Sequence, residues 1–512
     1  MGAVRFACVA LVALAAHAVG FTAEPPLWFE GGRATSQAQL AVKLLAESTS
    51  HGLDPADYEA DSLARAIAAG AATSGDAATV AALDRRLTVA VERYLGDLHH
   101  GRIAPGQLPR GYAGVTNNRF DAASLLREAV AHHRLREAVD HAAPRLSQYD
   151  RLRQALARYR ALDNGPWSAT LPPLLPARGS PPKLEPGQNY SGTHVLRDRL
   201  VVLGDLMPTT ATGALYDEPL VAGIRAFQQR HGLTADGVIG KATLAQLEVP
   251  PRARGRQIEL MLERLRWTPL MQGPRMIVVN IPEFTLRAYE VQGERIAVQA
   301  TMKVIVGKAL NTRTPLFAEQ MRFVEFQPFW NVPPSIARGE VVPRLRRDPG
   351  YWDREGFEFV AGGNVITTLS PALLDETLAG RARIRQRPGP KNALGDIKFV
   401  FPNNDNIYLH HTPAVNLFAR DRRDFSHGCI RVEQPVALAR FVLKDRPEWD
   451  EARIQRAMSD DAPLTLRLAE PIPVLIAYGT AMVKEGRVYF YEDVYGHDRA
   501  LDAALRARRP PL

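Results

Sequence analysis

The hydrophobic periodicity of the chain changes near residue 275, and this change divides it into a helical part and a strand-rich part. Before that point, Ala- and Leu-rich stretches such as 40–45 and 87–95 repeat apolar residues at helical spacing. Beyond it, β-branched and aromatic runs occupy residues 276–281, 285–289, 295–300 and 303–307. Pro282 and Gly293 interrupt these runs, which predicts hairpins and an antiparallel sheet. The helical scaffold and the sheet therefore belong to different domains.

The helical part contains residues that begin and end its helices. Asp54 fits a helix cap and Pro55 a first-turn residue, directly after Gly52-Leu53. A further helix is expected at 149–162, and the proline-rich residues 166–186 are typical of a linker. We therefore place a helical scaffold domain at residues 24–165.

The N-terminus has the pattern of an export signal. Arg5 precedes an apolar run at 6–16, and the small residues around Ala18 form a cleavage site, so residues 1–18 are interpreted as a signal peptide. The run is shorter than the roughly 20 apolar residues that span a bilayer. Membrane attachment would arise only from an uncleaved leader. Cys8 stands before most of the apolar run, which argues against a lipid-modified N-terminal cysteine.

The charge pattern excludes some classes of partner. The formal net charge is +9, but Lys and Arg are scattered and do not form a stripe with aromatic residues between them, so nucleic acid is not the expected partner. The sequence has no Gly-rich lysine loop and no dinucleotide fingerprint. For an exported protein, a modest positive balance suits a carboxylate-rich polymer such as a bacterial cell wall.

The segment Ser426-His427-Gly428-Cys429 carries the candidate chemistry, and we expect it on a loop after the sheet. Apart from Cys8 in the leader, Cys429 is the only cysteine; exported proteins normally pair their cysteines, so an unpaired thiol beside a histidine indicates a nucleophile. His427 lies two residues before it, and His410 lies seventeen residues before His427. Because Gly428 permits a close backbone approach, the amides of Gly428 and Cys429 are candidates for an oxyanion site.

Two histidines and a cysteine within twenty residues also raise the alternative of a zinc hydrolase. Only one sulfur is available and the four-ligand structural pattern is absent from the sequence, so we favour a thiol enzyme without metal. Metal analysis of the purified protein would separate the two.

Residues 187–249 describe small helices joined by glycine turns, with Gly232 suited to a helix C-cap and Asp236-Gly237 to a tight turn. This pattern resembles the peptidoglycan-binding type 1 module, a small three-helix bundle. The alternative is a helical spacer.

A wider resemblance follows from His410, a gap of fifteen residues, and Ser426-His427-Gly428-Cys429-Ile430-Arg431. This spacing resembles the signature of the L,D-transpeptidase (YkuD-type) catalytic domain, whose core is a β-rich sandwich. The leader, the scaffold, the wall-binding module, Trp330-Asn331-Val332-Pro333-Pro334 and Tyr408-Leu409-His410 come in the order of the large YcbB-like periplasmic enzymes.

The resemblance implies a multidomain α+β fold. It joins a helical scaffold, a small three-helix wall-binding module and a β-rich sandwich catalytic domain at 270–500. A connecting helix at 254–268 leads into that domain, and a helix-bearing cap is inserted at 331–386.

Roles are carried over by position. The implied catalytic residues are Cys429 as nucleophile, His427 as its proton partner, His410 as a residue that orients the site or assists the base, Gly428, and Ser426 as a loop-shaping hydrogen bonder. The implied substrate-binding residues are Arg431, which would hold a carboxylate or brace the loop, Trp330 and Tyr408. His411 departs from the family pattern and leaves open which histidine faces the thiol; strand alternation favours His410.

The implied reaction is acyl transfer on peptidoglycan, with no cofactor. Cys429 attacks the carbonyl of the third residue of a tetrapeptide donor stem, releases D-alanine and forms a thioester. The side-chain amine of a diamino acid in an acceptor stem then resolves it to a 3,3-cross-link. Such enzymes act in the periplasm of Gram-negative bacteria on wall structure and cell shape, and carbapenems acylate them.

Alternatives on the same site differ in the group that resolves the thioester. Water would make the protein an L,D-carboxypeptidase or endopeptidase, and a lipoprotein lysine would make it an anchoring enzyme. A different class is a non-catalytic peptidoglycan-binding scaffold.

Overall fold

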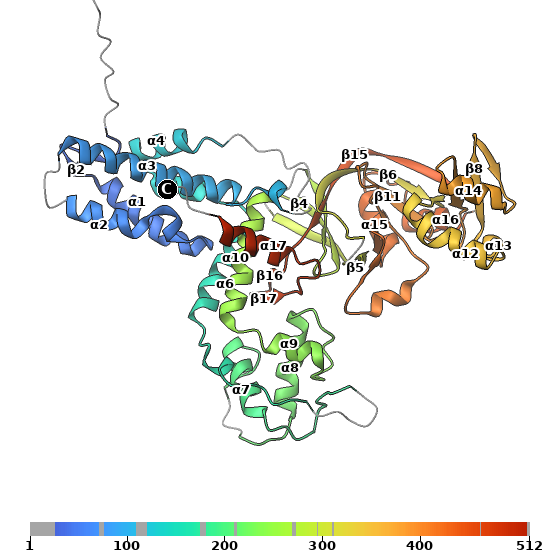
Figure 1. Ribbon diagram of the computed structural model, residues 1–512, viewed down its shortest axis with the longest axis horizontal. Coiled ribbons are helices and arrows are strands. Elements are labelled where there is room, and N and C mark those ends of the chain that lie inside the picture. Colours follow the sequence, from blue (N-terminus) through green and yellow to red (C-terminus); the bar gives the residue numbers. More distant parts are fainter. Residues whose placement is uncertain are drawn as a thin grey trace, which may run out of the picture.

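The computed structural model describes residues 26–70, 76–108, 120–174, 181–208, 212–268, 273–293, 295–309, 312–460 and 462–508 (Figure 1). The predicted leader at 1–18 lies outside these residues. Among the residues that are described, every helix is too short or too polar to cross a membrane.

The N-terminal part is helical, as predicted. After the short strands β1 (Phe29–Glu30) and β2 (Arg33–Ala34) it contains α1 (Ser36–Ala46), η1 (Glu47–His51), η2 (Pro55–Tyr58), α2 (Ala60–Gly70), α3 (Ala77–His100), η3 (Pro105–Gln107), α4 (Ala122–Ala131), α5 (Leu135–Ala142), α6 (Ser147–Ala161) and η4 (Gly165–Trp167). Side-chain caps begin several of these helices; Asp76, for example, accepts from the backbone N–H of Thr79. Asp54 caps a turn with Pro55 in its first position, as expected, but the turn is a single 3-10 turn.

The expected wall-binding module, residues 187–249, contains α7 (Thr193–Leu203), α8 (Glu218–Arg230) and α9 (Lys241–Leu247). Its core is continuous with α6, with the long α10 (Pro251–Trp267) and with the hairpin of β16 (Ala481–Lys484) and β17 (Arg487–Phe490) near the C-terminus. Phe490 is fully buried in this shared core. The module is therefore packed against the rest of the chain, as the green helices below the sheet show in Figure 1.

Among the described residues, nine strands form one sheet in the order β13-β5-β14-β12-β11-β6-β15-β3-β4. They are β3 (Arg275–Asn280), β4 (Thr285–Gln292), β5 (Arg295–Gly307), β6 (Phe317–Phe326), β11 (Ile397–Val400), β12 (Leu409–His410), β13 (Asp424–Ser426), β14 (Ile430–Val432) and β15 (Leu464–Ala477). β4 also pairs with β5, so the sheet closes on itself around a core. The α+β fold class is confirmed.

Three details of the predicted sheet were wrong. The sheet is mixed, because β12 and β14, β13 and β5, and β15 and β3 pair in parallel. The runs 295–300 and 303–307 are one long strand, β5. The cysteine segment was expected on a loop after the sheet, but it lies inside it, between β13 and β14.

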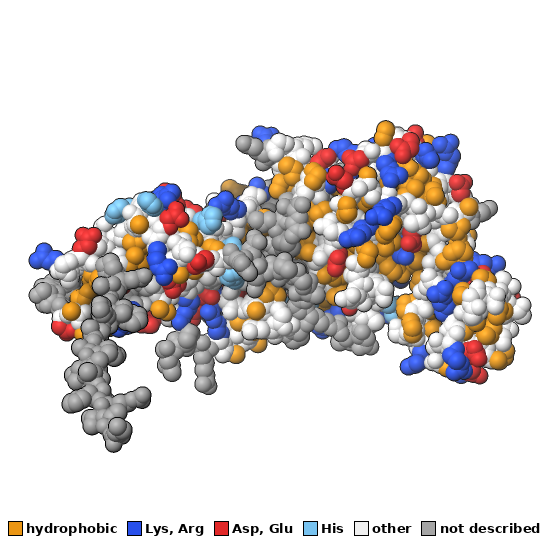
Figure 2. Space-filling model, turned by 90° about the horizontal axis from the view of Figure 1, so that it is seen from above, with side chains coloured by type: hydrophobic (Ala, Val, Ile, Leu, Met, Phe, Trp, Pro, Cys, Tyr) orange, Lys and Arg blue, Asp and Glu red, His pale blue; other side chains and the backbone are white. Residues whose placement is uncertain are grey.

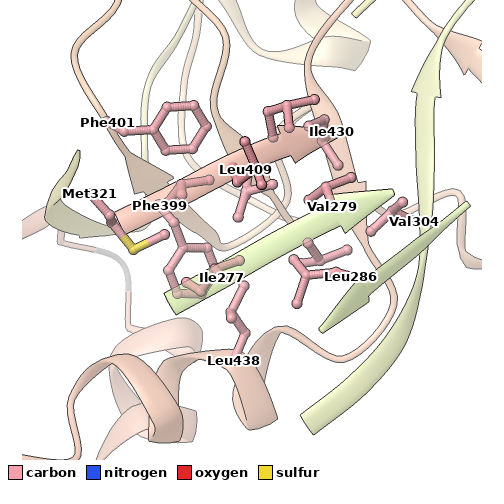
Figure 3. Close-up of a cluster of buried hydrophobic side chains, with 14 of the residues drawn as sticks. Ile277, Val279, Leu286, Val304, Met321, Phe399, Phe401, Leu409, Ile430 and Leu438 are labelled. Carbon is pink, nitrogen blue, oxygen red and sulfur yellow. The ribbon is translucent and has the colours of Figure 1, made fainter. Parts of the chain in front are cut away.

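Figure 3 shows the core of this sheet. Leu409 of β12 and Ile430 of β14 lie among the buried side chains of the other strands and of Leu438 from α15 (Pro435–Val442). Both are fully buried. Side chains alternate along a strand, so the neighbours of Leu409 and Ile430 face the opposite side of the sheet.

The cap has its own small core. It contains β7 (Trp330–Asn331), α11 (Pro334–Ile336), η5 (Ala337–Val341), α12 (Val342–Arg347), α13 (Tyr351–Glu355), β8 (Phe357–Ala361), β9 (Asn364–Ile366), α14 (Pro371–Leu378) and β10 (Ala382–Gln386). Trp352 is buried against Phe357 and Phe359, so it belongs to the core of the cap. Asn392 donates to the carbonyls of Pro328 and Arg387, so one side chain ties together the two chain segments that enter and leave the cap.

The remaining helices cover the catalytic domain. They are η6 (Val415–Ala419), α16 (Glu451–Ser459) and α17 (His497–Ala507). On the face of the molecule shown in Figure 2, Lys and Arg side chains are interspersed with Asp and Glu over the described surface.

Candidate active site

The register of β12 and β14 brings four polar side chains to one face of the sheet. The pairing aligns Leu409 with Ile430 and His410 with Arg431. Because Leu409 and Ile430 point into the core (Figure 3), their neighbours point away from it. These neighbours are Tyr408, His410, Cys429 and Arg431.

The Cys429 thiol is half-buried beside the end of β12. Its Sγ donates to the carbonyl oxygen of Asn406 at 3.6 Å. Burial raises the pKa of the Cys429 thiol, and this rise is opposed by hydrogen bonds from the backbone and side chain of Tyr408 and by the charges of Lys398 and Arg431. The free protein therefore holds a neutral thiol near groups that favour the thiolate, and it needs a base to release the proton.

His410 is a neutral histidine on the same face of the sheet as the thiol. It is 4% exposed, and burial and then the charge of Arg431 lower its pKa to about 3, so the ring is neutral. Its Nδ1 lies 2.5 Å from the carbonyl oxygen of His411. A carbonyl only accepts, so Nδ1 carries the hydrogen and the lone pair is on Nε2.

His411 has a different partner. Its Nδ1 is 2.7 Å from the carboxylate of Asp396. It contributes its backbone carbonyl to the orientation of His410, which is a contact that the sequence does not reveal.

His427 contacts the cap. Its Nε2 is 2.6 Å from Oε1 of Glu340 in η5. The role of proton partner that the sequence predicts for His427 is therefore in competition with His410, which lies on the same face of the sheet as Cys429.

A network of hydrogen bonds shapes the turn before Cys429. Gly428 has φ +122°, a conformation that favours glycine, and a Cβ there would lie only 3.1 Å from Cδ1 of Ile407. The N–H of Gly428 donates to Oγ of Ser426 at 3.1 Å, which means that the amide expected in the oxyanion site already has a partner. Thr314 donates to the carbonyl of Gly428. The loop-shaping role expected for Ser426 agrees with these contacts.

Arg431 is half-buried, and its Nε has no hydrogen-bond partner among the described residues. Burial lowers the pKa of the guanidinium. An unpartnered buried donor on the face that carries the thiol is suited to an anionic ligand group. Trp330 lies in the cap strand β7 and packs against the cap core.

Sequence reasoning missed three residues of the site. Lys398 of β11 pairs with His410 in register and its Nζ lies 4.5 Å from the ring centre of Tyr408. Asn403 donates to the carbonyls of Phe401 and Ile407, which fixes the loop that carries Asn406 to the thiol. The turn-forming run 403–406 was a signal for such a loop, whereas Lys398 needed the register of the sheet.

Comparisons with known proteins agree with this architecture. Residues 274–454 match the family model described as "L,D-transpeptidase catalytic domain", residues 22–156 match the "Scaffold domain", and residues 190–247 match the "Putative peptidoglycan binding domain". The wall-binding identity expected from the glycine turns is thus supported by a family match.

A Haemophilus influenzae protein described as "Putative L,D-transpeptidase" is 32% identical over 253 residues, which cover 49% of this chain and 49% of the relative. The matched part thus spans about half the length of that curated relative. A solved L,D-transpeptidase structure from Stackebrandtia nassauensis is 14% identical and covers 60% of this chain and 97% of that one, with a TM-score of 0.23.

Proposed function

This chain carries an L,D-transpeptidase catalytic domain together with a scaffold domain and a peptidoglycan-binding domain, and from this premise we propose that it forms 3,3-cross-links between peptidoglycan stems through a thioester on Cys429. The proposed place of action is the periplasm. The observation that carries the proposal is the convergence of Cys429, Tyr408, His410 and Arg431 on one face of adjacent parallel strands.

In the proposed acylation step, Sγ of Cys429 attacks the carbonyl carbon of the third residue of a tetrapeptide stem. The thiol proton passes to Nε2 of neutral His410 and from there to the nitrogen of the departing D-alanine. The carbon–nitrogen bond breaks as the carbon–sulfur bond is completed. Tyr408 stabilises the thiolate as it forms, because its donors point to the sulfur.

Arg431 is the proposed contact for a carboxylate of the donor stem. The support is its half-buried guanidinium with an unpartnered Nε. A bound carboxylate would supply that partner and fix the stem relative to the thiol.

The amine of a diamino acid on a second stem is the proposed acceptor. Hydrolysis by water and transfer to a lipoprotein lysine use the same thioester and remain the alternative outcomes. The presence of a base and a thiol on one face of the sheet favours a catalytic domain over a non-catalytic scaffold.

The proposal is tested with purified full-length protein and disaccharide-tetrapeptide muropeptides. We expect release of D-alanine and a dimer with the mass of a 3,3-linked product, and Cys429→Ala should lose several orders of magnitude in rate. D-alanine release by the alanine variant at the wild-type rate would exclude the cysteine mechanism. Monomeric tripeptide as the sole product would instead identify a carboxypeptidase.

The wall-binding part of the proposal has a separate test. The full-length Cys429→Ala protein cannot be captured covalently, so its sedimentation with insoluble peptidoglycan reports binding alone. We expect it to sediment as wild type does. Recovery of all the protein in the supernatant would leave the segment as a helical spacer.

A further inference from the structure

A carboxylate of the cap lies against the catalytic segment. Oε1 of Glu340 is 2.6 Å from Nε2 of His427, although 87 positions separate the two residues in the sequence. The side chains are 56% and 30% exposed, respectively. His410 is buried, so the Glu340–His427 pair lies on the solvent-accessible side of the site and His410 on the enclosed side.

The backbone of the cap holds Glu340 in this place. η5 (Ala337–Val341) is a π-helical turn between α11 and α12, and its end residues Ala337 and Val341 are buried in the cap core. A π-helical turn displaces the residues within it relative to a regular helix, and such turns are frequent at functional sites. A Cβ on Gly339 would meet no atom within 4 Å, so there is open space next to Glu340.

The contact determines which ring nitrogen of His427 can accept a proton. With Glu340 ionised and His427 neutral, Nε2 of His427 carries the hydrogen and Nδ1 carries the lone pair. In serine protease triads, an acid bonded to one ring nitrogen orients the histidine and offsets the charge that forms when the other nitrogen takes a proton. The Glu340–His427 pair has the corresponding arrangement with the two ring nitrogens exchanged.

The proposed reaction needs two proton acceptors at different times. The first takes the proton of Cys429, for which His410 is placed. The second takes a proton from the incoming amine, and Glu340 and His427 lie on the side of the site that is open to solvent. An amine acceptor also arrives as a cation, which a carboxylate attracts, whereas water carries no charge.

We propose that His427 is the general base for the acceptor amine and that Glu340 is its positioning residue, an inference that rests on the proposed function. The acceptor ammonium first releases one proton to solvent. The neutral amine nitrogen then bonds to the thioester carbonyl carbon, and the carbon–sulfur bond breaks with its electron pair on Sγ of Cys429. The proton leaving the nitrogen goes to Nδ1 of His427 and then returns to the thiolate.

The experiment separates formation of the thioester from its resolution. Full-length protein is mixed with a tetrapeptide muropeptide, with and without an amine-bearing acceptor muropeptide, and the thioester is followed by intact-mass analysis of quenched samples. Glu340→Gln removes the charge at nearly constant volume. We expect resolution relative to formation to fall on the order of tenfold, so that thioester accumulates in the presence of acceptor.

Matched variants control the result. Glu376→Gln makes the same change in α14 of the cap, where Glu376 pairs with Arg381 at 3.8 Å, and should keep the wild-type ratio. Glu340→Asp retains a carboxylate, so it should recover part of the rate of thioester resolution that Glu340→Gln loses. Glu340→Gln combined with His427→Ala should be no worse than His427→Ala alone, because the two residues act as one unit.

The inference is overturned if Glu340→Gln keeps the wild-type ratio, if it slows formation and resolution equally, or if the double variant shows additive losses. Thermal unfolding of the variants checks that the exposed substitution leaves the fold intact. A wild-type protein that forms no thioester at all would count against the proposed function, which distinguishes the two failures.

Discussion

The hydroxyl of Ser426 donates to the carbonyl oxygen of Cys429 at 2.5 Å and, through the same oxygen, accepts the N–H of Gly428. The side chain thus closes the turn that carries the thiol. Ser426 is 2% exposed, so water cannot easily replace these contacts.

We expect Ser426→Ala to leave two backbone groups without partners and to reduce the free energy of unfolding by about 1–3 kcal/mol. D-alanine release should fall more than stability alone explains, because the turn loses its shape. Denaturant unfolding and steady-state kinetics measure the two effects. Ser459→Ala, an exposed hydroxyl at the end of α16, is the control. An active and equally stable Ser426→Ala protein would contradict this role.

His410 and His411 can be separated by substitution. His410→Gln removes the proton acceptor and should slow thioester formation by about 10²–10⁴-fold. His411→Asn removes the contact with Asp396 but keeps the backbone carbonyl that orients His410, so we expect a much smaller loss. Single-turnover mass analysis of the acyl-enzyme gives both rates. The assignment is reversed if His411→Asn is the more damaging change.

The reactivity of the thiol with iodoacetamide should report its surroundings. Burial raises the pKa of Cys429, so the thiolate fraction is small at neutral pH, and alkylation should increase with pH beyond the range of a free cysteine, whose pKa is about 8.5. Lys398→Met removes a cation that favours the thiolate and should move the profile to still higher pH.

Lys444→Met, at a surface lysine that pairs with Glu290 at 2.6 Å, is the matched control and should follow the wild-type profile. A profile that reaches its plateau near pH 6 in the wild type would mean that the thiolate is already formed in the free protein.

A carbapenem should acylate the same sulfur. Opening of the strained β-lactam amide by Cys429 would leave a thioester, and water should resolve it slowly if the acceptor is an amine, as proposed. Intact-mass analysis should show one added drug mass on the wild type. The adduct should be missing from Cys429→Ala, and its persistence there would place the reactive group elsewhere.

The contact between the wall-binding module and the β16–β17 hairpin should contribute measurably to the free energy of unfolding. Arg230 of α8 forms a buried ion pair with Asp205, and Arg487 of β17 lies 2.5 Å from the same carboxylate. Arg230→Met should destabilise the protein by about 3–5 kcal/mol, because a buried carboxylate loses its main partner. Denaturant unfolding tests this value, with the exposed Arg225→Met of the same helix as control. A loss no larger than that of the control would mean that Arg487 is sufficient.

The sequence predicted those parts of the fold whose signals are local. Helical periodicity predicted 149–162, and the structure has α6 at Ser147–Ala161. β15 (Leu464–Ala477) was missed because Pro471 and Pro473 interrupt its apolar run. The sheet accommodates Pro471 where the pairing with β6 shifts its register, whereas Pro473 lies opposite Gln320. The parallel pairs were also beyond reach, since strand direction depends on connections between distant segments.

The residues of the candidate site also fall into those that local sequence predicts and those that it does not. Cys429 and His410 followed from residue type and spacing, and both lie on one face of the sheet. Glu340 did not, because nothing in the sequence of the cap marks one exposed glutamate among several. Its contact with His427 depends on how the cap sits on the sheet, a relation that only the folded chain contains.

The β16–β17 hairpin belongs to the catalytic half of the chain in sequence, yet its apolar side chains complete the core of the wall-binding module. A binding module on a flexible linker raises the effective concentration of every substrate site that the linker can reach. A module that shares a core with its neighbour has one fixed offset from the thiol. On the proposed function, the part that binds peptidoglycan and the thiol are then a set distance apart, and this distance would limit which stems along a glycan strand can be joined.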